Sequence, residues 1–441
     1  MASKSLGPPL TADLGSAVAV NGSIYRSRAM WLLLAVSTMN FLDRKVASIL
    51  AEPMKLDLHL TDTQVGMMTG LAFATFYTFV GIPIARYSDR FGTSRPRLIA
   101  CALIFWSVMT ALCGMAQNFI HLMLARIGVG AGEAGCTPPS HSLISDLIPP
   151  EKRTSALAFY GLGLPIGTML GMSMGGVFAD LFGWRMAFFL CAIPGILIGI
   201  ATWIIVPEPR RAMFARNAGA VPTDQAVVPL RSVLVEVLKS RAFVFLTIAM
   251  SIGSFLSYGK GVWQAVFLIR VHGASPGAAG LALGLVAGLG SAAGAWFGGW
   301  MATRYGVRDR AYILTVVWVG QLVAMPLSVL AYTVDNWQLA AALMLAPAIV
   351  SGVSYGPVFT CLQGLVRPAS RGAAVAMFLL VQNLVGLGLG PMIFGMLSDF
   401  FRSWAGIESV RYVLYLSVLL APIPAFCFWA AGRYLEREML R

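Results

Sequence analysis

The chain is poor in charged residues. Only 12% of its 441 residues are Asp, Glu, Lys or Arg, whereas 58% are hydrophobic. Because a soluble protein carries about 25% charged residues, this deficit excludes an ordinary soluble globular protein and predicts a polytopic membrane protein. Residues 1–28 lack a continuous apolar run. We therefore expect them to form a cytoplasmic tail without a cleavable signal peptide.

The chain also lacks the residue groups that disulfides, metal sites and nucleotide-driven pumps require. Its 6 cysteines fall in apolar segments, without paired spacing and without a His at ligand spacing. We interpret them as small core residues. No Gly-rich loop with Lys-Ser or Lys-Thr follows a strand pattern, which argues against nucleotide hydrolysis. No nucleophile–base or metal constellation stands out, so we expect no enzyme, no cofactor and no metal.

Long apolar runs are abundant. A transmembrane helix needs about 20 mostly apolar residues, and twelve such runs lie near 29–50, 65–86, 98–117, 120–146, 154–179, 186–206, 242–270, 276–302, 311–333, 337–364, 372–399 and 410–432. The predicted fold is an all-α membrane protein with two six-helix bundles. Its parts would be a tail at 1–28, a bundle at 29–206, a cytoplasmic loop at 207–241, a bundle at 242–432 and a tail at 433–441.

Positive charge is unevenly distributed among the connections between these runs. The formal net charge is +13, from 32 Lys and Arg against 19 Asp and Glu. Most of the basic residues fall in the two tails and in alternate connections, which the positive-inside rule assigns to the cytoplasm. Orientation therefore explains the excess charge. We expect both termini to be cytoplasmic, a location in the inner or plasma membrane, and no nucleic-acid partner.

The two halves of the chain repeat one another. Two residues of the fifth run and one directly after it recur in the eleventh at a constant offset: Gly167, Gly171 and Asp180 reappear as Gly386, Gly390 and Asp399. The connections 147–153 and 365–371 also resemble each other at nearly the same offset. Parallel repeats around a site in the middle of the membrane are typical of transporters.

Small residues at four-residue spacing form stripes on the fifth and eighth runs. These residues are Gly163, Gly167, Gly171 and Gly175, and then Gly280, Gly284 and Gly288. Such stripes let helix backbones approach each other closely. Two interpretations stay open: the stripes are sites of static packing, or they are the surfaces along which the two halves move.

Two acids and two arginines stand out inside the first and fourth apolar runs. They are Asp43 and Arg44, then Arg126 and Glu133. A charge at the bilayer centre costs roughly 2.5–3.5 kcal/mol on insertion scales, so these side chains should face protein or water. With both acids ionised the four charges cancel, and protonating both acids leaves a positive site, which is the chemistry of a proton carrier. The alternative is a pair of structural ion pairs between two helices.

A single further charge lies within the apolar stretch of the seventh run. Lys260 stands near Trp263 and Gln264. Its long side chain would either extend to the outer membrane interface or contact a substrate headgroup. Most other runs of the second half carry no charge in their apolar stretches, so this half should contribute mainly shape and apolar surface.

The connection 87–95 is short, charged and predicted to be cytoplasmic. An Asp at a helix end can cap the amino end of a neighbouring helix through the helix dipole. Such a contact would latch one conformational state. We expect this latch to involve Asp89, Arg90, Gly92, Asp146 and Arg153. The alternative is a solvated basic turn.

Several motifs together resemble the major facilitator superfamily over roughly residues 28–435. The stretch 88–92 is similar to the signature motif between its second and third helices, although Thr303 replaces the Asp in the second copy. The stretch 126–130 resembles an arginine motif that this superfamily links to proton coupling. The stretch 163–176 resembles the glycine-rich motif associated with exporters.

Within that superfamily, the stretches 40–44 and 126–134 resemble the Spinster family. Spinster proteins are implicated in the export of sphingosine-1-phosphate and lysophospholipids. The resemblance implies an amphipathic, lipid-like or drug-like substrate. It also implies that Asp43, Arg44 and Glu133 belong to the coupling and substrate site.

These observations lead to one hypothesis. The protein would export an amphipathic, anionic-headed molecule, such as a lysophospholipid or a sphingosine-phosphate-like compound, by proton-coupled alternating access, as a monomer among membrane lipids. Protons would be carried by Asp43 and Glu133 with Arg126. Substrate would be bound by Asn40, Arg44, Arg126, Glu133, Lys260, Trp263, Gln264, Tyr355, Gln382 and Asn383. The alternatives are a multidrug or organic-anion carrier, an uncoupled facilitator, and a sensor or receptor that moves no substrate.

Overall fold

The computed structural model describes residues 11–90, 93–206, 208–209, 229–305 and 310–439, and helices make up almost all of them. No strand occurs among these residues. We call the helices before residue 207 the first bundle: α1 (Thr11–Ile49), α2 (Ala51–Leu58), α3 (Asp62–Gly66), η1 (Met67–Leu71), α4 (Ala72–Asp89), α5 (Arg95–Gly114), α6 (Phe119–Glu133), α7 (Thr137–Leu147), α8 (Pro150–Gly161) and α9 (Gly163–Ile205).

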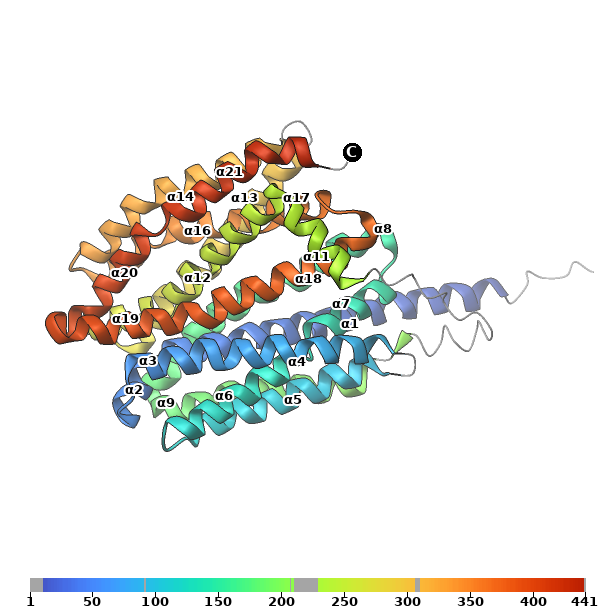
Figure 1. Ribbon diagram of the computed structural model, residues 1–441. Coiled ribbons are helices and arrows are strands. Elements are labelled where there is room, and N and C mark those ends of the chain that lie inside the picture. Colours follow the sequence, from blue (N-terminus) through green and yellow to red (C-terminus); the bar gives the residue numbers. More distant parts are fainter. Residues whose placement is uncertain (1–10, 91–92, 207, 210–228, 306–309, 440–441) are drawn as a thin grey trace, which may run out of the picture.

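We call the helices after the short helix α11 (Leu230–Lys239) the second bundle. It comprises α12 (Arg241–Arg270), α13 (Pro276–Arg304), α14 (Arg310–Thr333), α15 (Trp337–Leu343), α16 (Leu345–Val353), α17 (Tyr355–Gly364), η2 (Pro368–Ser370), α18 (Arg371–Gln382), η3 (Asn383–Leu389), α19 (Gly390–Ala405), η4 (Gly406–Glu408), α20 (Ser409–Leu419) and α21 (Pro422–Glu438). Figure 1 shows the long helices of both bundles running in broadly the same direction.

Eight helical segments in the described part of the chain are long and apolar enough to cross a membrane. Two of them, Pro150–Ile205 and Pro368–Glu438, are 56 and 71 residues long, which exceeds the length of a single crossing. Positive φ angles at Gly183 (83°) and Gly406 (57°) interrupt these segments. The remaining predicted runs lie on α1, which carries three consecutive charges, and on the shorter pair α6 and α7. The protein is therefore a multi-pass helical membrane protein.

Two helix boundaries differ from the sequence-based prediction. The predicted tail is helical from Thr11 onward, because α1 continues without a break and no Pro interrupts residues 11–28. The predicted run 120–146 is not one helix, since α6 ends at Glu133 and α7 begins at Thr137. Pro138 lacks the N–H that a continuous helix would need, and its ring obstructs the preceding turn. The break therefore falls directly after the buried acid of this run.

The two bundles touch through backbone at a pair of π-helices, η1 and η3. A Cβ atom on Gly70 would lie 2.6 Å from the carbonyl oxygen of Gly388, and one on Gly66 would lie 2.3 Å from that of Pro391. Only residues without a side chain allow this approach. Because π-helical turns are frequent at functional sites, this contact is a natural place for the bundles to change their relative position.

The two glycine stripes have different partners. A Cβ on Gly167 would lie 2.3 Å from the carbonyl oxygen of Thr38, so the stripe on α9 packs against α1 within the first bundle. A Cβ on Gly280 would lie 2.3 Å from the carbonyl oxygen of Met172, so the stripe on α13 packs against α9. The first stripe therefore fits static packing within one bundle. The second stripe lies between the bundles, which is where a surface for relative motion would have to lie.

We expect Gly167→Ala to lower the melting temperature of the purified protein. Overpacking costs about 1–3 kcal/mol, and the added methyl would collide with the backbone of α1. Gly161→Ala is the control, because nothing lies within 4 Å of a Cβ at that position. Equal thermal shifts for the two variants would show that the α1–α9 contact is looser than described.

Candidate functional site

A buried ion pair joins α1 to α6. The Nε–H of Arg44 donates to Oε2 of Glu133 at 2.7 Å, and the Glu133 side chain is fully buried. Asp43, also fully buried, accepts a hydrogen bond of 2.8 Å from the indole N–H of Trp106 on α5. The sequence did not show which charges pair. In the structure Arg44 pairs with Glu133, and Asp43 bonds to the indole of Trp106.

Aromatic rings surround the two arginines. The Cζ atom of Arg44 lies 4.6 Å from the ring centre of Tyr77 and 4.8 Å from that of Phe73. Arg126 lies over the same Phe73 ring, at 5.3 Å. A cation held over an aromatic face is attracted by the ring quadrupole. These rings also bring the two guanidinium groups together, although sequence analysis did not single out either aromatic residue.

Several buried polar atoms of this cluster have no hydrogen-bond partner among the described residues. The acceptors are Oδ1 of Asp43 and Oε1 of Glu133. The donors are Nδ2 of Asn40, Nη2 of Arg44, and Nε and Nη1 of Arg126. A buried polar group left without a partner costs about 1–3 kcal/mol. The cluster therefore presents acceptors and donors that a proton or a polar ligand would satisfy.

Three predicted substrate residues of the second bundle bond to helices of their own bundle. Trp263 is fully buried and its indole N–H donates to the carbonyl oxygen of Pro391 at 3.0 Å. The Gln264 amide donates to the hydroxyl of Tyr332 at 2.9 Å, and the Gln382 amide donates to that of Ser254 at 2.7 Å. In this conformation these residues fasten α12 to its neighbours, so we leave them out of the function proposed below.

The other three occupy less defined surroundings. Asn383 begins η3 and is partly buried. Lys260 is also partly buried, and no acid within the described chain forms an ion pair with it. The side chain of Tyr355 lies outside the described residues.

Lys45 is a charged residue that the sequence analysis did not single out. A Cβ on Gly261 would lie 3.3 Å from its Nζ atom, so Lys45 reaches from α1 to α12, next to Lys260. Like Lys260, it makes no ion pair with any acid in the described ranges. Its position directly after the Asp-Arg pair was the available signal. The two lysines add positive charge where the bundles meet.

Two aspartates cap helices of the opposite bundle at the end of the molecule where α2, α3 and α19 lie, here called the Asp62 end (Figure 1). Asp399 of α19 accepts from the backbone N–H groups of Asp62 and Thr63 at 3.0 and 2.8 Å, which caps α3. Asp180 of α9 accepts from the N–H of Gly277 at 3.0 Å, which caps α13. These are the repeat-related aspartates, and each favours its partner helix through the dipole.

An ion network closes the same end. Arg270, at the end of α12, contacts Glu52 at 2.6 Å and Asp62 at 2.7 Å, and Lys55 also contacts Asp62. All four side chains are at least nine-tenths buried. Because Arg270 belongs to the second bundle and the acids to the first, the network holds the bundles together at the Asp62 end.

The predicted latch residues lie at the opposite end. Asp146 accepts from Nη1 of Arg95 at 2.6 Å, and Arg95 also contacts Glu208. Arg153 is exposed and donates to the carbonyl oxygen of Ile148 at 3.2 Å, and Arg90 is exposed. Gly92 and the side chain of Asp89 lie outside the described residues. The latch at this end stays a prediction, whereas helix capping between the bundles occurs at the Asp62 end.

A multi-pass helical protein with two packed bundles and charged residues buried among apolar helices has an architecture typical of secondary transporters. The chain belongs to the Major Facilitator Superfamily, whose sequence profile matches residues 33–391. Within it the chain resembles Spinster proteins, as predicted, and it is a transporter-type protein and not an enzyme.

Individual relatives support this placement. The chain is 32% identical over 417 residues to an MFS-type efflux pump of Mycolicibacterium smegmatis, which covers 93% of this chain and 94% of that one. It is 30% identical over 239 residues to the sphingosine-1-phosphate transporter SPNS2 of Danio rerio, covering 53% of this chain and 46% of that one. A bacterial homolog of human lysosomal Spinster, solved inward-facing and unoccupied, has a TM-score of 0.83 at 30% identity, covering 95% and 99%.

Removing the buried acid should destabilise the protein more than removing an exposed one. Glu133→Ala leaves Arg44 buried without its partner, and breaking a buried pair this way costs about 3–5 kcal/mol. Glu133→Gln keeps an acceptor and should lose less. The control, Glu408→Ala, removes a partly exposed pair with Arg411, for which about 0–1 kcal/mol is expected. Thermal melts that rank the three variants otherwise would contradict a stabilising role for the Arg44–Glu133 pair.

Proposed function

We propose that the protein is a proton-coupled transporter that exports a lipid-like molecule by alternating access. The observation that carries this proposal is the buried cluster of Asp43, Arg44, Arg126 and Glu133, whose polar atoms are only partly hydrogen-bonded. Small-molecule transport follows from the family. A lipid-like substrate is supported by the relative named as a sphingosine-1-phosphate transporter, and export by the relative named as an efflux pump.

The cluster offers a physical basis for exchanging protons against substrate. An ammonium group of the substrate would bind the free oxygens of Asp43 and Glu133, which are the atoms that a proton would occupy. The two would therefore exclude each other, as proton antiport requires. A phosphate of the same headgroup would accept hydrogen bonds from Asn40 and Arg126, and charged hydrogen bonds of this kind are the strong ones.

Positive charge between the bundles also favours binding of a phosphate. Lys45 and Lys260 come from opposite bundles and carry no acid partner in the described chain. Together with Arg126 they favour a phosphate over a neutral headgroup. The acyl chain of the substrate would lie against the largely apolar helices of the second bundle, as the sequence predicts. We therefore expect the substrate to carry both an ammonium and a phosphate on a single long chain.

We further infer twelve crossings with both termini in the cytoplasm, from the distribution of basic residues. In this orientation the Asp62 end faces outward. The capping aspartates and the Arg270 network would then close the outer side, and substrate would enter from the cytoplasm. Release outside would require these contacts to break. A multidrug efflux pump is the second candidate, because the relative from Mycolicibacterium smegmatis bears the name of an efflux pump.

Flux in proteoliposomes tests the coupling. We expect a fluorescent lysophospholipid with an ammonium headgroup to move against an imposed pH gradient, toward the acidic side. Asp43→Asn removes one exchangeable proton and should abolish the gradient dependence. The matched control is Asp57→Asn, which alters an exposed acid paired with Arg185. Flux that persists unchanged without a gradient would make the protein a facilitator, and drug transport without lysophospholipid transport would favour the second candidate.

Removing the two capping aspartates should favour opening of the Asp62 end. Losing an N-cap costs about 1 kcal/mol, so Asp180→Ala with Asp399→Ala should shift the equilibrium toward outer opening by roughly 30-fold. Labelling by an impermeant maleimide reports this shift at Ser409→Cys, since Ser409 is fully buried beside Ser398 at the Asp62 end. The exposed Cys101 is replaced by Ser in this background.

Asp57→Ala is the control for the gate experiment, because its partner Arg185 belongs to the same bundle. It should leave the labelling rate unchanged. If the labelling rate is the same with both aspartates present and with both replaced by Ala, the two aspartates do not hold this end closed.

A further inference from the structure

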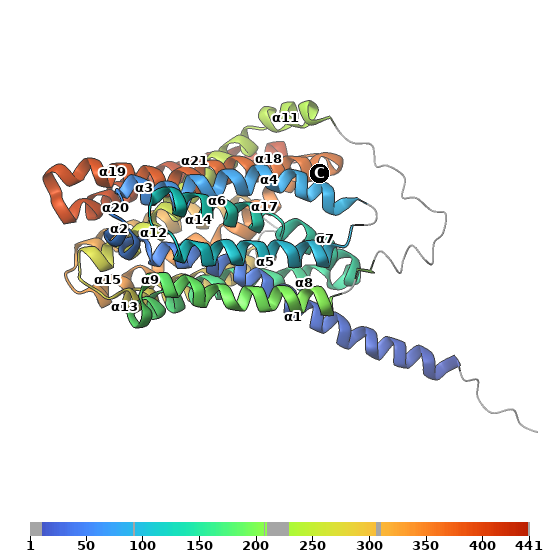
Figure 2. The same cartoon turned by 90° about the horizontal axis from the view of Figure 1, so that it is seen from below.

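The short helix α11 lies at the edge of the molecule. It crosses the direction of the long helices in Figure 1 and lies outside them in Figure 2. Val233 and Val237, one turn apart, are buried against the second bundle. Leu234, Val235 and Leu238 are 44%, 44% and 63% exposed. The helix is therefore anchored by one apolar face and presents a second apolar face outward.

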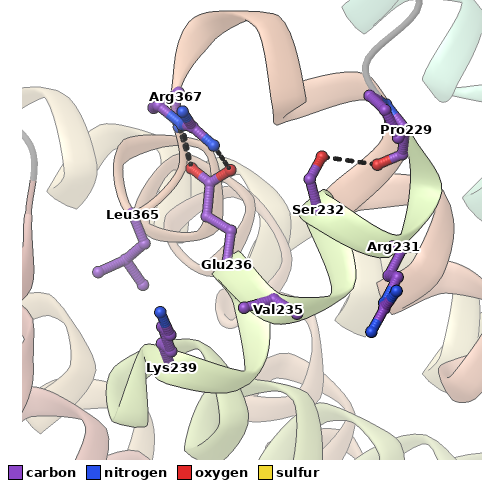
Figure 3. Close-up of a pocket in the computed structure, with 8 residues that line it drawn as sticks. All are labelled: Pro229, Arg231, Ser232, Val235, Glu236, Lys239, Leu365 and Arg367. Carbon is purple, nitrogen blue, oxygen red and sulfur yellow. Dashed lines mark hydrogen bonds and ion pairs between the residues drawn. The ribbon is translucent and has the colours of Figure 1, made fainter.

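An ion pair fixes the orientation of α11. Glu236 accepts from the backbone N–H of Arg367 at 2.9 Å and from its Nη2 at 3.1 Å (Figure 3). It also accepts from the Ser370 hydroxyl at 2.8 Å. The hydrogen bonds from Arg367 lower the pKa of Glu236 to about 2. Its contribution to stability is therefore present above the ordinary pKa of a Glu and lost only as pH falls through about 2. The outward face of α11 keeps its direction at any physiological pH.

A basic hollow adjoins that outward face. Its volume is about 700 Å³, and its lining includes three cations, Arg231, Lys239 and Arg367, with one acid, Glu236, that Arg367 already pairs. Arg231 and Lys239 are exposed, and neither has an ion-pair partner within the described chain. They flank the apolar residues, eight positions apart, which is about 12 Å along the helix.

Apolar residues flanked by cations on a peripheral helix match one class of partner. Helices that lie in a membrane interface bury their apolar residues among the acyl chains and set Lys and Arg against anionic headgroups. A soluble protein partner would not need both features on a helix that lies outside the long helices of a multi-pass membrane protein. The hollow is wide enough for a phosphate headgroup, since pockets for small molecules begin at about 300 Å³.

We propose that α11 is an interfacial helix and that the hollow beside it binds an anionic phospholipid of the surrounding membrane. Leu234 and Leu238 contact the acyl chains, while Arg231 and Lys239 contact the phosphate. Arg367 faces the same headgroup and is positioned by Glu236. This site lies apart from the Asp43 cluster, and it does not depend on the identity of the transported molecule.

Lipid binding to the full-length protein tests the proposal. Native mass spectrometry in a neutral detergent, with added phosphatidylglycerol or phosphatidylcholine, should show preferential binding of phosphatidylglycerol. Neutralising Arg231 and Lys239 together with Gln should weaken that binding by roughly 25-fold, because each cation near an anionic surface contributes about fivefold. The matched control is Lys152→Gln with Arg437→Gln, which removes the same charge at two other exposed positions. An equal loss in both double variants, or no preference between the lipids, overturns the proposal.

A second measurement reports where the apolar face lies. A nitroxide attached at Leu238→Cys, with exposed Cys101 replaced by Ser, should be more accessible to oxygen than to a water-soluble nickel complex. A label at Arg437→Cys, an exposed position, should show the opposite order. Nickel accessibility at 238 equal to that at 437 would place α11 in water. Low accessibility to both reagents would mean that protein covers the face, and either result overturns the proposal.

Discussion

The ion pair between Arg44 and Glu133 is the contact on which the candidate site depends. Neither charge could be buried in the apolar bundle alone, because an isolated ion loses its hydration without compensation. Their pairing, together with the Phe73 and Tyr77 rings around Arg44, compensates for the lost hydration of both charges. Asp43 is then tolerated through the Trp106 indole, and Arg126 through the face of Phe73. The site is thus a set of charges that are only partly satisfied, which leaves them responsive to protons and ligands.

The contacts between the bundles are of a different kind. At the Asp62 end they include polar contacts, namely two caps and one arginine-centred network. The bundles also meet through glycine-lined backbone, as at Gly70 and Gly280. Close-packed backbone slides with little rearrangement of side chains, whereas caps and ion pairs are made or broken as units. A structure of this kind favours two discrete states separated by the making or breaking of a few polar contacts.

Much of the fold could be predicted because it depends on local sequence patterns. Apolar runs give the long helices, and the multi-pass family assignment followed from motifs such as 88–92 and 126–134. The break after Glu133 was missed although Pro138 marks it, because the run is long enough for a single membrane-spanning helix. The helix over residues 11–28 was missed because the lack of a continuous apolar run was interpreted as a tail.

The site was less predictable because its partners are distant in sequence. The charged residues were recognisable from the cost of burying charge, but not that Arg44 would pair with Glu133 or that Asp43 would meet Trp106. The Asp180 and Asp399 repeat was visible, yet the helices that they cap lie about one hundred or more positions away. The direction in which a side chain points could not be predicted either. No local sequence feature distinguishes Trp263, which bonds to the backbone of α19, from a ring that faces a ligand.

The two capping aspartates have a consequence for how such a chain could arise. Because they occupy equivalent positions in two parallel repeats, a half-length ancestor would have needed only one of them. As a twofold homodimer it would have formed the contact twice, each copy capping the other across an isologous interface. A single substitution would then have opened or closed both contacts together. Duplication and fusion of such an ancestor would separate the two copies, so that each capping contact could change without the other.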